Sequence, residues 1–509
     1  MRLNILIGGK AGQGINKVSG IVSGVLSKLG YFTFNYRDYP SLIRGGHNFN
    51  VLSISDEQIE SHESSLDVIV AMDERTLETH KSFQKTDCEI IKADEFKDAG
   101  KNLNIVLAGI LIKLLGISFK SLSEELVLQF KESKDKAAFA KKGFDSRKKK
   151  FDLKPLKKKI SILSGSEAVA VGARNSGLDI YFAYPMTPAT NALHELAKDQ
   201  VKNNLMVFQA ENEIAAASMA IGASFAGAKV LTGTSGGGFD LMSETLSLQG
   251  ITQIPLTVYL ASRPGPGTGI PTYTSQGDLN LALRAGHGEF PRIVVAPGNA
   301  VEQIEKTSEA LFLAEHFRIL SIILSDKHLA ESEFSSDVGP TKTPYFEVIR
   351  ESPGSSIIKA SSYETNEHGL STESAVIAGK NIGERMKKYE TSKEFIEKHF
   401  KMVKYHGKMD SKNLVIGWGS TSGAIKDAIK GLDAKFLQVL YMKPLSSEIK
   451  NEIEKSDKVV LVECNVTGQL GRLIREKTGI KIKNRILKYN GRPFYCDELN
   501  GYLKKVIGG

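Results

Sequence analysis

The sequence predicts a multidomain α/β protein built on parallel sheets. Three regions, residues 1–130, 160–335 and 411–509, each alternate short apolar strands with amphipathic helices, an order typical of βαβ units. A chain of 509 residues also exceeds what a single hydrophobic core usually serves. We expect a basic linker at 131–159 and a polar, irregular connecting arm at 336–410 to separate the three domains.

In the first region, the spacing of apolar residues sets the expected elements. Short apolar runs bounded by turn residues predict strands, and apolar residues three and four positions apart predict helices. We expect strands at Leu3–Ile7, Asn48–Ser53 and Asp67–Ala71 and helices at Ile15–Leu29 and Leu103–Leu115.

A glycine-rich turn, Gly8–Gly14, joins the first strand to the first helix. Backbone N–H groups at such a place can bind a phosphate. The spacing departs from G-x-G-x-x-G and no Lys-Ser/Thr pair follows, so a tight packing turn is favoured over a dinucleotide site. A second glycine loop, Ser41–His47, could bind an anion or dock on a neighbouring domain.

The second and third regions repeat the alternation of strands and helices. In the second we expect helices at Ser166–Gly177, Thr190–Lys198 and Glu213–Ala226 and strands at Ile180–Ala183, Lys229–Thr234, Leu256–Ala261 and Ile293–Ala296. In the third we expect strands at Leu414–Gly417, Lys435–Tyr441 and Lys458–Glu463.

The turn Tyr184–Thr190 follows a predicted strand and contains two prolines. Proline fixes φ and removes the backbone N–H, so the turn is expected to be rigid. The hydroxyl of Thr187, held between the prolines, is placed to donate to a substrate oxygen. The alternative is a capping loop in which Thr187 or Thr190 caps the next helix.

Two carboxylates, Glu211 and Glu213, stand at the start of a helix rich in alanine. The helix dipole favours acidic residues there, which is the ordinary explanation. The helix behind them is small and apolar, so we expect it to be buried on all sides. Residues two apart on a helix point about 200° apart, so one of the two carboxylates is expected to enter a poorly solvated pocket.

Two further loops have compositions that suit a ligand. Thr232–Asp240 contains three consecutive glycines, which permit close approach of a ligand or another chain, although a flexible surface loop has the same composition. Arg263 begins a loop stiffened by three prolines. A fixed guanidinium can clamp a carboxylate through two hydrogen bonds, whereas a lone loop arginine is more often a surface residue.

Composition argues against several other classes of protein. The formal net charge is +9, but much of the excess lies in Lys134–Lys159, where a solvated linker is favoured over a nucleic-acid-binding arm. Three widely spaced cysteines predict neither a structural metal nor an iron–sulfur cluster in this chain, and they suit the cytoplasm. No apolar stretch approaches a membrane span, and Leu3–Ile7 is too short for a signal sequence.

Taken in order, these motifs resemble the α subunit of the 2-oxoacid:ferredoxin oxidoreductases, the family of the pyruvate and 2-oxoglutarate enzymes. The similar segments are Tyr184–Pro188, with Met186 where the family has isoleucine, Gln209–Ala216, Thr234–Phe239, Arg263–Thr272, Gln276–Asp278 and His287–Pro291. Residues 1–130 resemble the family's γ domain, fused ahead of α. Residues 411–509, with Val462–Leu470 and Tyr489–Phe494, resemble a transketolase C-terminal domain.

The resemblance implies roles for individual residues. Thiamine pyrophosphate would bind between the pyrimidine-binding domain, 160–335, and a separate β subunit, with Glu213 activating it and Tyr184 and Pro185 contacting it. Thr187 and Arg263 would hold the substrate carboxylate and oxo group, with Thr272 nearby. The γ resemblance suggests coenzyme A contacts at Arg44, Gly12 and Gly14.

The resemblance also implies partners and a reaction. The β subunit would carry Mg²⁺ and a 4Fe–4S cluster, because this chain has neither a Gly-Asp-Gly…Asn pattern nor a set of cysteines for a cluster. An (αβ)₂ heterotetramer would oxidise a 2-oxoacid with coenzyme A and reduce ferredoxin, with 2-oxoglutarate favoured over pyruvate. Two alternatives stay open: a Rossmann-type NAD(P) oxidoreductase, and a non-catalytic scaffold subunit of a thiamine enzyme.

Overall fold

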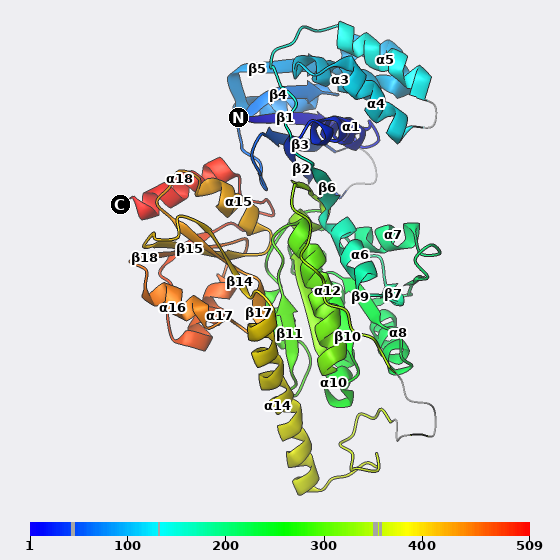
Figure 1. The fold of residues 1–509 in the computed structure, drawn as a ribbon, viewed down its shortest axis with the longest axis vertical. Helices are drawn as coiled ribbons and strands as arrows, with labels where there is room; N and C mark the ends of the chain where they lie inside the picture. The colour runs from blue at the N-terminus through cyan, green and yellow to red at the C-terminus, as the bar shows by residue number, and fades with distance from the viewer. Residues whose placement is uncertain (42–45, 131–132, 350–354, 356–358, 509) are drawn as a thin grey trace. The chain divides into compact units, whose positions relative to one another are not determined.

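The computed structural model describes residues 1–41, 46–130, 133–349, 355 and 359–508, and it confirms an α/β fold (Figure 1). The described residues divide into two compact units. Unit 1 comprises Met1–Leu163, Ser332–Gly339 and Tyr495–Gly501, and unit 2 comprises Ser164–Glu331, Pro340–Phe494 and Tyr502–Gly509. The chain therefore leaves unit 1 and returns to it twice.

Unit 1 contains a mixed sheet rather than the parallel sheet that we predict. Its strand order is β5-β4-β1-β3-β2-β13-β6. β1 pairs in parallel with β4, but β3 runs antiparallel to β1 and to β2, because the connection between β2 and β3 is too short for a crossover. The strands are β1 (Arg2–Gly9), β2 (Phe32–Asp38), β3 (Asn48–Ser55), β4 (Leu66–Ala71), β5 (Gln84–Lys92), β6 (Ser161–Ser164) and β13 (Glu333–Ser336).

The predicted basic linker contains a helix, α5, that belongs to the fold of unit 1. A Cβ on Gly143 of α5 would lie 2.0 Å from the Val106 carbonyl, and one on Gly109 of α3 would lie 2.1 Å from the Ala140 carbonyl. The backbones of α3 and α5 pack closely because each helix has a glycine at the contact. Such small residues do not give the sequence a long apolar period, so the sequence analysis does not predict α5. The helices are α1 (Ile15–Lys28), α2 (Glu74–His80), α3 (Leu103–Leu114), α4 (Phe119–Gln129) and α5 (Ser133–Asp145), with 3₁₀ segments at Lys81–Phe83 and Ala93–Asn102.

Unit 2 begins with a doubly wound sheet of strand order β17-β11-β12-β10-β9-β7-β8. Its strands pair in parallel except β17, which runs antiparallel to β11. The strands are β7 (Ile180–Ala183), β8 (Met206–Gln209), β9 (Val230–Thr234), β10 (Leu256–Ser262), β11 (Arg292–Val295), β12 (Leu320–Asp326) and β17 (Tyr441–Lys443).

Helices cover both faces of this sheet and bury separate apolar cores. Val258 of β10 packs in a core with Ala216 and Phe239, and the next residue, Tyr259, packs in another core with Val169 and Leu311. This alternation follows the period of two of a strand buried on both faces. The helices are α6 (Gly165–Asn175), α7 (Thr190–Lys198), α8 (Glu213–Phe225), α9 (Gly236–Leu241), α10 (Ser243–Thr252), α11 (Leu279–Arg284), α12 (Ala300–Phe317) and α13 (Lys327–Glu331).

The rest of unit 2 is a smaller α/β part with strand order β14-β16-β15-β18-β19. The predicted strand Lys435–Tyr441 divides into β16 and β17, which join different sheets and tie the two parts together. The strands are β14 (Val403–Gly407), β15 (Asn413–Trp418), β16 (Lys435–Val439), β18 (Lys458–Glu463) and β19 (Asn484–Leu487), and the helices are α15 (Thr421–Ala428), α16 (Glu448–Glu454) and α17 (Gln469–Thr478). The last helix, α18 (Cys496–Ile507), is divided between the units, with its residues up to Gly501 in unit 1 and those from Tyr502 in unit 2.

Two expectations for unit 2 are wrong. The predicted irregular arm contains the long helix α14 (Ala375–His399) and the strand β14. Helix α8 is not buried on all sides, since Ile214, Met219 and Phe225 are 51%, 41% and 41% exposed. Ala216, Ala217, Ala220 and Ile221 pack in the core, while Ile214, Met219 and Phe225 face outward. In the described ranges, no helix has both the length and the apolar character needed to cross a bilayer.

Candidate active site

Three of the predicted loops meet at one edge of the doubly wound sheet. β7, β9 and β10 are adjacent and parallel, so the residues after their carboxyl ends lie side by side, where ligands of such sheets usually bind. The Tyr184 turn follows β7, the glycine turn follows β9 and the Arg263 loop follows β10. The N-cap of α7 is Ala189 and has no side-chain cap, so neither Thr187 nor Thr190 has the capping role.

Arg263 joins two of these loops. Its Nη1 donates to the main-chain oxygen of Thr187 over 2.9 Å, the one hydrogen bond that the guanidinium makes within the described residues. Burial lowers the pKa of Arg263, while Asp278 and Glu213 oppose that shift, so both carboxylates act on the guanidinium. The group therefore keeps N–H donors for an anion.

Glu213 is the buried member of the carboxylate pair. It is the first residue of α8 and is 3% exposed, whereas Glu211 is exposed. Asn212 caps the helix by accepting a hydrogen bond from the Ala215 N–H at 2.8 Å. Glu213 Oε1 is buried with no hydrogen-bond partner among the described residues, which is costly unless a ligand supplies one.

The three glycines after β9 form the first turn of helix α9 rather than a flexible loop. A Cβ on Gly238 would lie 2.6 Å from Glu213 Oε1, and a Cβ on Gly236 would lie 2.5 Å from Asp278 Oδ2. We predict that a ligand or another chain approaches these glycines closely. In the structure, the carboxylates of Glu213 and Asp278 approach two of them.

Asp278 is a candidate site residue to which the sequence analysis gives no role. Burial raises the pKa of Asp278, against the nearby Ser262 hydroxyl and Arg263 guanidinium, which lower it. The one feature of the sequence that could have identified Asp278 as a site residue is its place in the Gln276–Asp278 motif.

The other predicted residues of this edge are less tightly connected. Thr272 is buried, and its hydroxyl has no hydrogen-bond partner in the described part of the chain. Tyr184 is exposed and Pro185 is half-buried. No hydrogen bond among the described residues links Tyr184 or Thr272 to Arg263, so their roles stay predictions.

Two of the proposed coenzyme A residues, Gly12 and Gly14, belong to unit 1. Gly12 and Gly14 have φ values of 87° and 84°, which only glycine adopts readily. A Cβ on Gly14 would also lie 2.9 Å from Asn104 Nδ2, which agrees with a packing turn. Arg44 lies outside the described residues.

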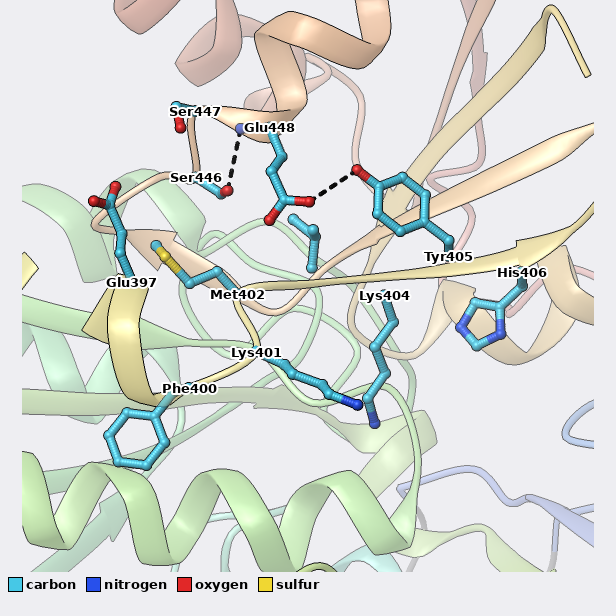
Figure 2. A pocket seen from close by; sticks show the side chains of 11 residues that line it. Glu397, Phe400, Lys401, Met402, Lys404, Tyr405, His406, Ser446, Ser447 and Glu448 are labelled. Carbon is cyan, nitrogen blue, oxygen red and sulfur yellow. Dashed lines mark hydrogen bonds between the residues drawn. The ribbon is translucent and has the colours of Figure 1, made fainter. Parts of the chain in front are cut away.

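A hollow of about 800 Å³ lies elsewhere, between the end of α14, β14 and the turn before α16 (Figure 2). Its lining includes none of the candidate site residues at the sheet edge. Its polar groups are largely paired within the chain: the Tyr405 hydroxyl donates to Glu448 at 3.1 Å, and Lys404 pairs with Glu302 at 3.0 Å. We therefore place the candidate site at the sheet edge.

Comparison with known proteins identifies the family. A family profile described as pyruvate flavodoxin/ferredoxin oxidoreductase, thiamine diphosphate-binding, matches residues 171–403. A second, described as pyruvate ferredoxin/flavodoxin oxidoreductase, matches residues 4–96. The 2-oxoacid:ferredoxin oxidoreductase subunit alpha of Sulfolobus sp is 31% identical over 100% of this chain and 97% of that protein.

Two further relatives are named for 2-oxoglutarate. The 2-oxoglutarate oxidoreductase subunit KorA of Mycobacterium tuberculosis is 30% identical over 68% of this chain and 57% of its own length. The structure of 2-oxoglutarate:ferredoxin oxidoreductase from Magnetococcus marinus, with 2-oxoglutarate, coenzyme A and succinyl-CoA bound, matches with a TM-score of 0.88, 26% identity and 99% coverage of both chains. The chain belongs to the 2-oxoacid:ferredoxin oxidoreductase family, as an α-type subunit that includes the family's thiamine diphosphate-binding domain.

Proposed function

We propose that this chain binds the 2-oxoacid and activates thiamine pyrophosphate in a coenzyme A-dependent 2-oxoacid:ferredoxin oxidoreductase. The observation that carries the proposal is the buried, unpartnered carboxyl oxygen of Glu213, which approaches Gly238 in the turn after β9, next to the strand that leads into the Arg263 loop. A subunit that served only as a scaffold would have no use for this arrangement, because an unsatisfied buried acceptor destabilises the fold.

The residues at the sheet edge fit the cofactor. Glu213 Oε1 lacks the hydrogen-bond partner that a ring nitrogen of the aminopyrimidine would supply. When bound, thiamine pyrophosphate supplies a nucleophilic carbon and an electron sink for decarboxylation. Glu213 would hold a proton at the ring nitrogen, and Tyr184 and Pro185, at the end of β7, would contact the ring.

Arg263 and Thr187 would orient the substrate. The guanidinium retains N–H donors that can bind a carboxylate, and its hydrogen bond to the Thr187 carbonyl fixes the two residues together. The Thr187 hydroxyl would donate to a substrate oxygen. Thr272, with its unpartnered buried hydroxyl, would bind nearby.

A β subunit would complete the enzyme. Mg²⁺ and the 4Fe–4S cluster that passes electrons to ferredoxin would lie on that subunit, in an (αβ)₂ assembly in the cytoplasm. The outward-facing Ile214, Met219 and Phe225 of α8, the helix that begins with Glu213, support burial against a second chain.

We propose 2-oxoglutarate as the substrate ahead of pyruvate, on the names of the Mycobacterium and Magnetococcus relatives. Coenzyme A would contact unit 1 at Gly12, Gly14 and Arg44. The Rossmann-type alternative loses support for two reasons. The sheet that contains the strand before the glycine turn is mixed, and the chain belongs to the 2-oxoacid:ferredoxin oxidoreductase family.

The test is activity with and without the partner. The chain co-purified with its β subunit should reduce a viologen dye with 2-oxoglutarate and coenzyme A, more slowly with pyruvate, and the chain alone should not. Turnover by the isolated chain would contradict a site shared with a second subunit. A preference for pyruvate would overturn the proposed substrate only.

A further inference from the structure

Thr272 lies in a hydrogen-bonded turn near the end of the loop that begins at Arg263. The Tyr273 N–H donates to the Ile270 carbonyl at 3.2 Å, which makes Thr272 the third of the four residues of the turn. Pro271 is the second, a position that its fixed φ suits. Thr272 is 5% exposed, and within the described ranges its hydroxyl has no hydrogen-bond partner. The turn therefore holds a buried hydroxyl that a ligand can satisfy.

The tip of this loop gives the turn little support. Its residues Gly265–Ile270 are exposed, and a Cβ on Gly267 would meet no described atom within 4 Å. The Ile270 N–H donates to the Pro264 carbonyl at 3.3 Å, which closes the tip at its base. The contacts that hold the turn must therefore come from another part of unit 2.

A segment near the end of unit 2 supplies these contacts. A Cβ on Gly491 would lie 2.5 Å from Ile270 Cδ1 and 3.2 Å from Tyr273 Cβ, so the Gly491 backbone packs against both ends of the turn. The Gly491 carbonyl also accepts from the Thr274 N–H at 3.0 Å. The guanidinium carbon of Arg492 lies 3.6 Å from the centre of the Tyr273 ring, the distance of a close cation–π stack.

Both sides of this contact are anchored independently of the stack. On one side, Asn490 Oδ1 accepts from the Arg492 N–H at 3.1 Å. On the other, the Thr274 hydroxyl donates to Asp326 Oδ1 at 3.0 Å and accepts from the His328 N–H at 3.2 Å.

The chain beyond the turn is also fixed. The Gln276 N–H donates to the Cys464 carbonyl at 2.8 Å, and the Gln276 carbonyl accepts from Asn465 Nδ2 at 3.2 Å. Because these anchors do not involve the Arg492 side chain, its removal should loosen the turn and leave the surrounding fold in place.

We infer that Arg492 is a positioning residue for the 2-oxoacid: by stacking on Tyr273 it holds the turn in which the Thr272 hydroxyl is placed to donate to the substrate. Tyr273 is bonded directly to Thr272, so a ring held on one face fixes the orientation of its neighbour. The inference rests on the proposed role of Thr272 in substrate binding.

A double-mutant cycle in the assembled enzyme tests this inference. Thr272→Val removes the hydroxyl and should raise the KM for the 2-oxoacid by about tenfold, the size expected for one hydrogen bond to a charged group. Arg492→Ala should raise it by about three- to tenfold and leave kcat and the KM for coenzyme A unchanged. In the Thr272→Val background, Arg492→Ala should change KM by less than about twofold, because the two residues act through one contact.

The matched control is Lys488→Ala, which removes another cation of the same segment. Lys488 Nζ lies 5.5 Å from the centre of the Phe494 ring, which is not part of the turn, so this variant should leave KM unchanged. If Arg492→Ala fails to fold, Tyr273→Leu removes the other partner of the stack and should give the same non-additive pattern.

The outcomes separate the two claims. An equal rise of KM in both backgrounds, no rise with Arg492→Ala, or an equal rise with Lys488→Ala would overturn the positioning role and leave the Thr272 contact intact. An unchanged KM with Thr272→Val would overturn the substrate contact of Thr272, and the positioning role with it, without affecting the roles proposed for Glu213 and Arg263.

Discussion

Arg263 Nη1 donates to the main-chain oxygen of Thr187 over 2.9 Å, and this bond connects the loops that follow β10 and β7. The side chain is partly buried between these loops and under the influence of Glu213 and Asp278. An arginine fixed in this way can bind a carboxylate without first losing side-chain freedom.

The Arg263 clamp can be tested with a conservative substitution. Arg263→Lys keeps the charge but loses the planar fork, so the KM for the 2-oxoacid should rise by about ten- to a hundredfold. The measurement is steady-state kinetics of the assembled enzyme. Arg284→Lys, at an exposed arginine of the same unit, should leave KM unchanged, and an equal effect at both positions would argue against the clamp.

The glycine turn after β9 offers a second test. A Cβ on Gly238 would lie 2.1 Å from Thr234 Oγ1 and 2.6 Å from Glu213 Oε1, whereas one on Gly237 would meet nothing within 4 Å. Gly238→Ala should displace the Glu213 carboxyl and lower kcat by about a hundredfold, the order expected for a misplacement of about 1 Å. Gly237→Ala should retain activity. Equal kcat values for the two variants would mean that the position of Glu213 does not matter.

Buried histidines predict acid sensitivity of unit 2. Burial, with a contribution from Lys327, lowers the pKa of His328 to about 3, and burial with Lys426 lowers that of His406 to about 4, from an ordinary 6.5. Below pH 6.5 the unfolded chain binds protons that the folded chain does not, so the stability that these groups contribute above pH 6.5 is lost as the pH falls.

As the pH falls below 6.5, each histidine should reduce the free energy of unfolding by up to about 1.4 kcal/mol per pH unit. Urea unfolding between pH 7 and pH 5 measures the slope. His406→Gln should flatten it, and substitution of the exposed His368 should not. A slope that is the same in both variants would contradict the neutral, buried state of His406.

Much of the fold follows from local sequence patterns. β7, β18 and α7 have the predicted ends, because proline, glycine and charged residues bound clear apolar runs there. α5 is missed, because Gly109 and Gly143 achieve close packing without a long apolar period. The sequence analysis predicts β16 and β17 as one strand. β17 forms a separate strand because it pairs with the distant β11, and a local sequence pattern cannot predict that pairing.

Part of the candidate site could be predicted from the sequence. The argument from helix angles does not apply to Glu211, because α8 begins at Glu213 and Glu211 precedes the extended N-cap Asn212. Only the structure shows that Glu213 is the buried carboxylate and Glu211 the exposed one. The environment of Asp278 and the bonds of Gln276 depend on residues up to 189 positions away, so they could not be derived from neighbouring sequence.

The most direct test of the central claim is the pair Glu213→Gln and Glu211→Gln in the assembled enzyme. Glutamine cannot take up and return the proton that a carboxylate does, so Glu213→Gln should lower kcat by about 10²- to 10⁴-fold while the assembly stays intact. Glu211→Gln, at the exposed neighbour, should leave kcat unchanged. Full activity of the Glu213→Gln enzyme would contradict the proposal and make this subunit a support rather than a catalyst.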